Sequence, residues 1–171
     1  MIRTSELTEA TIELLEFINE CDRRGYKNNN SLEAMRFNWC LETGGMWYAT
    51  YDNEKIVGIS GVHPFMDGWR ALFRGCQLYS EPGGLSKNHM NCWMFKYHLP
   101  LVIDRHWPRP IFVTTNTDND ASGKMLKLNR LYFYLANKGI FEHLGEDVVF
   151  SVNQNIWELN IDAYEDVRGI Y

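Results

Sequence analysis

The sequence predicts a single α/β domain built on one mixed parallel and antiparallel β-sheet, and three observations lead to this fold class. Short apolar and aromatic runs alternate along the chain with segments whose apolar residues recur at helical spacing. Their predicted order is α-α-β-β-β-α-β-α-β-β, which combines an antiparallel meander, one parallel crossover and a final hairpin. The chain has 171 residues, 45% of them hydrophobic and 14% aromatic, so one domain spanning residues 1–171 can bury a dense core.

Two helices are predicted at the start of the chain. The first runs from about Thr8, which can cap it, to Arg23, and its apolar residues recur on one side. The second covers residues 32–41 and ends before Gly44 and Gly45, which can adopt the left-handed conformation that stops a helix.

Three strands are predicted next. Residues 46–51 and 56–62 read as a hairpin joined by a short polar turn. Pro64 is expected to end the second strand, because proline cannot donate to a sheet ladder. The third strand covers residues 69–79, and Gly75 within it predicts a bulge or a close approach of another backbone.

A further helix is predicted over residues 88–105, with Pro100 expected to kink it by removing one hydrogen bond. At the end of the chain, residues 140–144 and 148–159 read as two strands on either side of a turn formed by Gly145, Glu146 and Asp147. These two strands would close the sheet as an antiparallel hairpin.

The crossover before that hairpin is the most informative segment. Residues 111–115 are β-branched or aromatic and predict a buried strand, and a polar run over residues 116–120 leads into a helix that Gly139 stops. The apolar residues that recur at helical spacing are Met125, Leu128, Leu131, Tyr132 and Leu135. A strand that enters a helix through a polar turn exposes backbone N–H groups at its carboxyl edge, so a ligand is expected there.

Composition narrows the classes of function. The net charge of −5 gives no electrostatic reason to expect a nucleic-acid partner. No apolar run reaches the ~20 residues that span a bilayer, and residues 1–6 lack an apolar signal core, so a cytoplasmic protein without a membrane partner is expected. The four cysteines occur singly, so no metal site is expected, and three of them lie in apolar surroundings that predict small core residues, Cys76 and Cys92 among them.

With these elements in place, the chain resembles the GNAT superfamily of acyl-CoA-dependent N-acyltransferases, and is similar to its small phage-encoded members. The resemblance covers about residues 8–159 and rests on element order and three local stretches, although the family's usual first strand is short or missing. Residues 77–82 resemble the end of the family's fourth strand, residues 113–116 its fifth, and residues 132–141 its last helix and the entry to its sixth strand. For a phage-encoded member the resemblance implies the host cytoplasm.

The pyrophosphate loop departs from the family pattern. The family loop reads Arg or Gln, two residues, Gly, one residue, then Gly or Ala, whereas residues 85–90 contain no glycine. Two readings stay open. Either the loop has shifted register, with Ser86, Lys87 and Asn88 supplying N–H groups to the cofactor, or the protein no longer binds a cofactor.

The resemblance implies an acetyl-CoA site at the ends of the family's fourth and fifth strands. Its cofactor-binding residues would be Gln77, Leu78, Tyr79, Ser86, Lys87, Asn88, Asn116 and Asn119. Acyl transfer also needs an acid for the leaving thiolate and a base for the amine. The resemblance implies a tyrosine of the last helix as the acid, Tyr132 in preference to Tyr134, and the base candidate is His63, with Asp67 and Glu81 as the alternatives near the same strand ends. Tyr132 can equally be a buried ring, His63 a half-exposed turn residue, and the two asparagines caps of the next helix.

The loop between the first two helices lies where the family receives its acceptor. Arg23, Arg24 and Tyr26 would bind an acceptor that carries a carboxylate or phosphate, or form an ordinary solvated loop. The resemblance therefore implies an N-acetyltransferase acting on a primary amine of a small molecule or peptide, by direct attack in a ternary complex. The alternative is a binding or inhibitor protein that kept the scaffold without the cofactor, and a homodimer through the final strand stays open.

Overall fold

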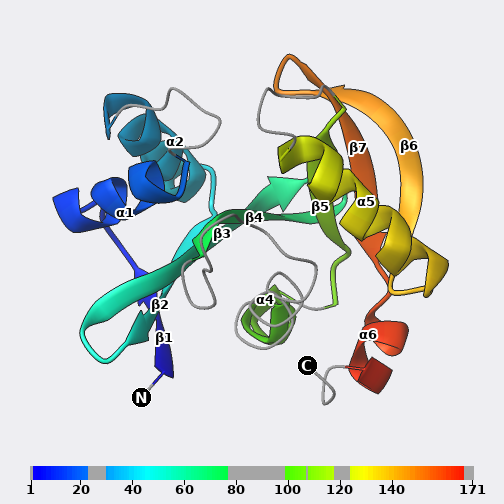
Figure 1. Ribbon diagram of the computed structural model, residues 1–171, viewed down its shortest axis with the longest axis horizontal. Helices are drawn as coiled ribbons and strands as arrows, with labels where there is room; N and C mark the ends of the chain where they lie inside the picture. The colour runs from blue at the N-terminus through cyan, green and yellow to red at the C-terminus, as the bar shows by residue number, and fades with distance from the viewer. Residues whose placement is uncertain (1, 23–29, 77–98, 107, 118–123, 168–171) are drawn as a thin grey trace.

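The structure, a computed structural model, describes residues 2–22, 30–76, 99–106, 108–117 and 124–167 (Figure 1). Helices and strands alternate along the chain and confirm the predicted mixed α/β fold class. In chain order the elements are β1 (Ile2–Leu7), α1 (Ile12–Asp22), α2 (Asn30–Glu42), β2 (Met46–Asp52), β3 (Lys55–Phe65), β4 (Gly68–Cys76), α4 (Leu99–His106), β5 (Ile111–Asn116), α5 (Lys124–Asn137), β6 (Phe141–Val149), β7 (Val152–Leu159) and α6 (Ile161–Val167).

All strands join one seven-stranded sheet in the order β1-β2-β3-β4-β5-β7-β6. The β4–β5 pair is parallel and the other neighbouring pairs are antiparallel. The predicted meander, crossover and final hairpin are therefore confirmed. The connection between β4 and β5 contains α4 and crosses over so that both strands run in the same direction. They are the parallel neighbours among the described strands, and they lie at the centre of the sheet.

The expectation of a short or missing first strand was wrong. β1 pairs with β2 along its whole length, from Ile2 opposite Asp52 to Leu7 opposite Trp47. Thr4 and Thr50 face each other across this pair with their hydroxyl oxygens 3.1 Å apart. β1 is the edge of the sheet, and the four residues between Ile2 and Leu7 are all polar, so its sequence carries neither an apolar run nor an alternating pattern that would reveal a strand.

β3 continues past Pro64, which was expected to end it. The strand runs to Phe65, with Pro64 opposite Trp69 of β4. The β2–β3 pairing stops at Met46 opposite Val62, so beyond that point β3 pairs with β4 alone among the described strands. Proline is tolerated on such an edge because its missing N–H interrupts no ladder on the open side.

The predicted turn at Gly145, Glu146 and Asp147 was also wrong. These residues lie within β6, where the register with β7 shifts between His143 and Gly145 and Gly145 adopts a φ of +100°. The hairpin turns instead at Phe150 and Ser151, whose φ values are 50° and 64°. Two central residues with positive φ match the right-handed twist of the flanking strands. Gly145 therefore forms a bulge, not a turn.

The helices cover opposite faces of the sheet, as Figure 1 shows for α1 and α2 above the strands and α4 below them. Neighbouring residues of β2 divide between the two faces: Trp47 packs with α1 and α2, whereas Tyr48 packs with α4. The cluster under α1 and α2 consists of Leu14, Leu15, Phe17, Ile18, Phe37, Cys40, Trp47, Ile56 and Ile59. The cluster on the other face includes Tyr48, Val62, Leu99, Val102, Ile111, Val113, Leu131, Tyr132, Leu135 and Trp157.

α5 has the predicted apolar side and the predicted end. Leu131, Tyr132 and Leu135 are buried. Gly139 closes the helix with a φ of +75° and donates its N–H to the carbonyl of Ala136 over 2.9 Å. α6 follows β7, was not predicted, and begins after Asn160, whose side-chain oxygen accepts the N–H of Ala163.

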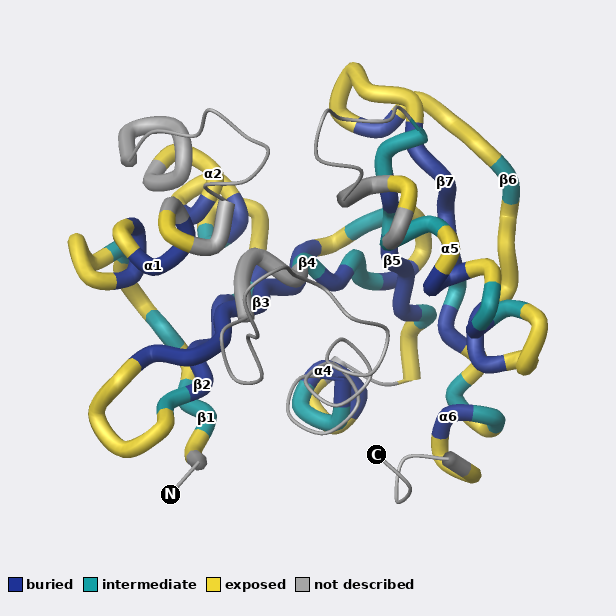
Figure 2. Tube along the Cα trace, viewed as in Figure 1, coloured by how far each residue is buried: buried dark blue, intermediate teal, exposed yellow. Residues whose placement is uncertain are grey.

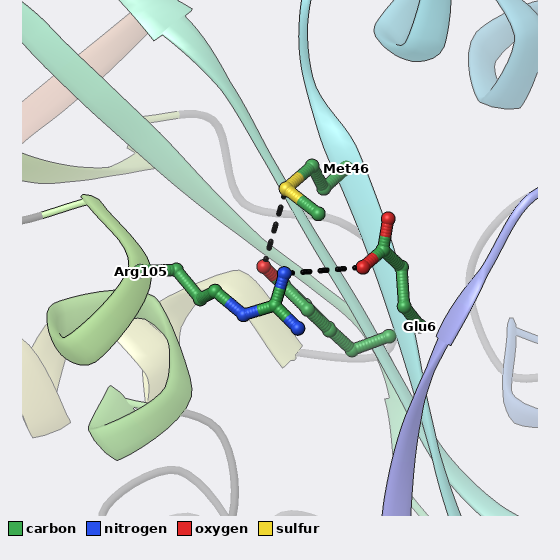
Figure 3. Close-up of polar contacts among 4 residues, drawn as sticks. Glu6, Met46 and Arg105 are labelled. Atoms are coloured by element: carbon green, nitrogen blue, oxygen red, sulfur yellow. Dashed lines mark hydrogen bonds and ion pairs between the residues drawn. The ribbon is translucent and has the colours of Figure 1, made fainter.

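α4 is held to the sheet mainly by apolar burial. Leu99, Val102 and Ile103 are buried in the core, whereas its one described ion pair, Arg105 to Glu6 of β1 at 3.2 Å, is exposed (Figure 3). Exposed ion pairs contribute little to stability. The rest of the helix predicted over residues 88–105 lies outside the described residues, so the kink expected at Pro100 stays a prediction.

β6 forms the other edge of the sheet and is exposed along most of its length (Figure 2). Its exposed residues include Glu142, Glu146 and Asp147. β6 therefore contributes to the core only near its ends, through the buried Phe141 and Val149, whereas its neighbour β7 buries Ile156, Trp157 and Leu159.

Candidate active site

β4 and β5 pair at one end and then separate. The described register contains two pairs, Trp69 opposite Ile111 and Arg70 opposite Phe112, and the Trp69 N–H donates to the Pro110 carbonyl over 2.8 Å. β4 continues to Cys76 and β5 to Asn116, with no further pairing between their described residues. The carboxyl halves of the two strands thus leave peptide groups that a ligand can pair with.

The predicted bulge in β4 is confirmed and lies along the separated half of that strand. Ile59 of β3 lies opposite Gly75, but the next residue, Ser60, lies opposite Phe73. Arg74 is therefore the extra residue. A bulge bends its strand and increases the local twist, which favours the divergence of β4 from β5.

Three side chains on adjacent strands meet where the two strands separate. Arg70 of β4 donates from Nε to the Thr114 hydroxyl of β5 over 2.7 Å. Its NH1 lies 3.2 Å from Nε2 of His63 on β3. The guanidinium is thus held between the two neighbouring strands.

His63 is buried within β3, so the expectation of a half-exposed turn residue was wrong. Its Nδ1 lies 2.8 Å from the Pro64 carbonyl, which can only accept, so Nδ1 carries the hydrogen and Nε2 accepts from Arg70. Burial, and then the positive charge of Arg70, lower the pKa of His63 from 6.5 to about 4. The imidazole is therefore neutral near pH 7, and its role as a base stays a prediction.

Two exposed aromatic rings lie beside this group. Trp39 of α2 has its ring centroid 5.0 Å from that of His63 and 5.2 Å from that of Phe150 in the β6–β7 turn. The guanidinium carbon of Arg70 lies 5.3 Å from the centre of the Phe150 ring. The sequence analysis missed both rings, because Trp39 fits the apolar side chains of the second predicted helix and Phe150 fits the last predicted strand. The positive φ of Phe150 carries no sequence signal.

Tyr132 lies in the core, which confirms the alternative that predicted a buried ring. It is 1% exposed, and its ring packs against Phe141 and Trp157 at centroid distances of 5.1 and 5.6 Å. Burial raises the pKa of its phenol and keeps the group protonated. A protonated phenol fits an acid, and that role stays a prediction.

Asn116, at the carboxyl end of β5, is held through its backbone. Its carbonyl accepts the side-chain N–H of Asn129 on α5 over 2.8 Å. The side-chain oxygen of Asn129 accepts from the hydroxyl of Thr115 and, over 2.9 Å, from the side-chain amide of Asn155 on β7. The side-chain amide of Asn129 therefore ties α5 to the end of β5 and to the middle of β7, a brace that sequence reasoning did not find.

The remaining predicted site residues lie outside the described residues, and their roles stay predictions. They are Arg23, Arg24, Tyr26, Gln77, Leu78, Tyr79, Ser86, Lys87, Asn88 and Asn119. Cys40 is buried, with its pKa raised to about 11 mainly by burial.

No protein-family profile and no curated protein matches this sequence. Solved structures do match. The aminoglycoside N-acetyltransferase AAC(6')-Ib11 aligns with a TM-score of 0.58 at 12% identity, over 96% of this chain and 99% of that chain. A GNAT family acetyltransferase from Elizabethkingia anophelis with acetyl-CoA bound gives 0.53 at 12% identity, over 92% and 97%. The ribosomal-protein-S18-alanine N-acetyltransferase from Escherichia coli gives 0.54 at 12% identity, over 93% of both chains.

This chain has the GNAT fold. The fold implied by the sequence resemblance is thereby confirmed, with β4 and β5 as the pair of parallel strands that separates. At 12% identity the likeness extends to the fold, and the activity has to follow from the site. No helix in the described part of the chain is long and apolar enough to span a membrane.

Proposed function

We propose that this protein is an acyl-CoA-dependent N-acyltransferase that transfers an acyl group, acetyl in the simplest case, to a primary amine. The observation that carries the proposal is the separation of β4 from β5 after two residue pairs. A GNAT-type cofactor arm is a chain of amides that can pair with strand backbone in such a gap. The reaction is direct attack of the amine on the thioester within a ternary complex.

The surroundings of the gap support this proposal. Asn129 fixes the carboxyl end of β5 through Asn116 and Thr115, so one wall of the gap is held by side-chain hydrogen bonds. The bulge at Arg74 bends the other wall. Because the walls of the gap are already ordered, the protein loses little conformational entropy when a long cofactor binds, and the free-energy cost of binding is lower.

Cofactor binding is tested first by thermal unfolding with millimolar acetyl-CoA and with free CoA. A ligand at ~100 times its Kd adds ~2.7 kcal/mol, which raises the melting temperature of a domain this size by several degrees. The absence of a shift with either ligand would count against the proposal and favour a binding or inhibitor protein.

Two variants then assign residues. Lys87→Glu is expected to weaken the acetyl-CoA shift, because it reverses a charge in the predicted pyrophosphate loop, whereas Lys55→Glu at the exposed first residue of β3 is the matched control. Tyr132→Phe is expected to slow turnover while leaving the shift intact. Unchanged turnover in that variant would remove Tyr132 from the mechanism.

A further inference from the structure

Among the described residues, five aromatic rings form a cluster on the face of the sheet that carries α2, beside the separation of β4 from β5. The members of this aromatic cluster are Trp39, His63, Phe65, Phe112 and Phe150. Neighbouring rings meet edge to face, with centroids between 5.0 Å (Trp39 to His63) and 6.4 Å (His63 to Phe65) apart. Phe112 belongs to the last described residue pair of β4 and β5, so the cluster borders the point where these strands part.

His63 and Phe112 form the buried base of the aromatic cluster. Both ring nitrogens of His63 already have partners in the protein, Nδ1 the Pro64 carbonyl and Nε2 the side chain of Arg70. In this arrangement the imidazole contributes ring surface to the cluster. Recognition of a ligand by the cluster therefore rests on apolar and aromatic contact.

Trp39 and Phe150 bring the aromatic cluster to the molecular surface. Trp39 is 40% exposed and Phe150 55% exposed. They come from α2 and from the β6–β7 turn, and their ring planes are 85° apart at a centroid distance of 5.2 Å. A third flat ring can extend this edge-to-face packing, which favours an aromatic ligand over a saturated one of the same size.

The backbone of Phe150 carries a conformational cost that favours a binding role for its ring. Its φ of 50° lies in the left-handed region, which glycine and asparagine adopt more readily than a bulky residue. Since the ring stays exposed, core burial offsets only part of that cost. Residues held in such conformations concentrate at ligand sites. Here the turn holds the Phe150 ring against Trp39 and His63 at the border of the gap.

We propose that the acceptor is a small primary amine that carries an aromatic ring, and that Trp39 and Phe150 bind this ring while the amine enters the gap between β4 and β5. The inference rests on the proposed function, which places the thioester in that gap. The uncharged amine nitrogen bonds to the thioester carbonyl carbon, the C–S bond breaks, and a proton from the nitrogen ends on the CoA sulfur. The products are the amide and the free CoA thiol.

The test uses 2-phenylethylamine and 2-cyclohexylethylamine, two alkyl amines of similar size and basicity. The ring of the first is aromatic and that of the second is saturated. Release of the CoA thiol at pH 7.5 gives kcat and KM for each amine with acetyl-CoA. We expect the wild-type kcat/KM to be about tenfold higher for 2-phenylethylamine, since each of two ring contacts contributes a few-fold.

Trp39→Leu and Phe150→Leu each remove one ring but keep an apolar side chain. Each should reduce the ratio about threefold, through a higher KM for 2-phenylethylamine with little change in kcat. Trp39→Phe should keep the wild-type ratio, because a ring remains at this position. Phe133→Leu is the matched control and should also keep the ratio, since it removes an exposed ring of α5 that packs on His143 and Trp157 instead.

A wild-type ratio near one, or a ratio that neither leucine variant of the cluster lowers, overturns the inference. So does an equal loss in Phe133→Leu, or turnover of neither amine by a protein whose melting temperature rises with acetyl-CoA. A wild-type protein without that rise defeats the proposed function itself, and the two failures are thereby distinguished. Because the wild-type ratio needs no variant, it tests the inference even if a leucine variant does not fold.

Discussion

Nε2 of His63 and NH1 of Arg70 lie 3.2 Å apart, and this hydrogen bond links β3 to β4 where β4 begins to leave β5. The Pro64 carbonyl fixes the hydrogen on Nδ1, so the direction of the bond follows: Arg70 donates and His63 accepts. The ring is locked in one tautomer and one charge state. Both the stability and the chemistry of this region depend on that state.

The first prediction concerns pH. The pKa of His63 is about 4 in the folded protein and near 6.5 in the unfolded chain, so the unfolded state binds more protons between these values. The free energy of unfolding should therefore fall as pH drops from 6.5, by about 2–3 kcal/mol at pH 4.5. Urea unfolding at pH 7 and 4.5 measures this loss, and His63→Gln should lack this part of it.

Thr114→Val is the control for that experiment. It removes the other acceptor of Arg70 but leaves His63 in place, so its loss of stability between pH 7 and 4.5 should match that of the wild type. If His63→Gln showed the full wild-type pH dependence, the neutral buried imidazole would not be the group that titrates.

The second prediction concerns the junction of β4 and β5. A Cβ added at Gly68 would lie 2.0 Å from the carbonyl oxygen of Pro110, the atom that accepts the N–H of Trp69. Gly68→Ala should cost about 2–4 kcal/mol, because backbone has to move to relieve the contact. Gly145→Ala meets open space and only the strain of its φ of +100°, so it should cost about 1 kcal/mol. Equal losses in denaturant unfolding would contradict the tight junction.

The third prediction concerns the brace at Asn129. Asn129→Ala leaves the Asn116 carbonyl, the Thr115 hydroxyl and the Asn155 amide without this partner, and should cost about 2–3 kcal/mol. Asn160→Ala, which removes one capping bond from α6, should cost about 1 kcal/mol. Chemical unfolding compares the two variants, and a loss no greater than that of Asn160→Ala would show that the brace is not cooperative.

The fourth prediction separates burial from charge in α4. Glu6→Gln removes the exposed ion pair with Arg105 and should change the free energy of unfolding by less than about 1 kcal/mol. Val102→Ala opens a cavity in the core beneath the same helix and should cost about 2–4 kcal/mol. Thermal unfolding of both variants at low and high salt measures the two losses. The loss in Val102→Ala should exceed that in Glu6→Gln at either ionic strength.

The sequence was sufficient to predict a helix or strand where its local residue pattern agrees with the burial of that element in the fold. β5 and α5 were predicted from β-branched residues, helical spacing and Gly139, and the structure places Leu131, Tyr132 and Leu135 of the expected apolar side in the core. It failed where pairing overrides local signals. Gly145 and its polar neighbours look like a turn, yet β7 pairs with them and the chain turns at Phe150, which has no turn propensity.

The same distinction applies to the site. The end of β5 could be predicted as a ligand edge, because a strand that enters a helix is a local motif. The His63–Arg70–Thr114 group could not, since its members come from three strands and are joined only by the register of the sheet. Trp39 and Phe150 are 111 positions apart and meet through tertiary packing alone.

β6 has a consequence for how copies of this protein can associate. An outermost strand is a template onto which a foreign strand can add, and natural proteins oppose such growth with charge and with kinks. Glu142, Glu146 and Asp147 lie on this strand, and the bulge at Gly145 bends it. A second copy of β6 aligned antiparallel with Glu142 opposite Asp147 would bring carboxylate against carboxylate, so charge opposes that pairing at this border of the sheet.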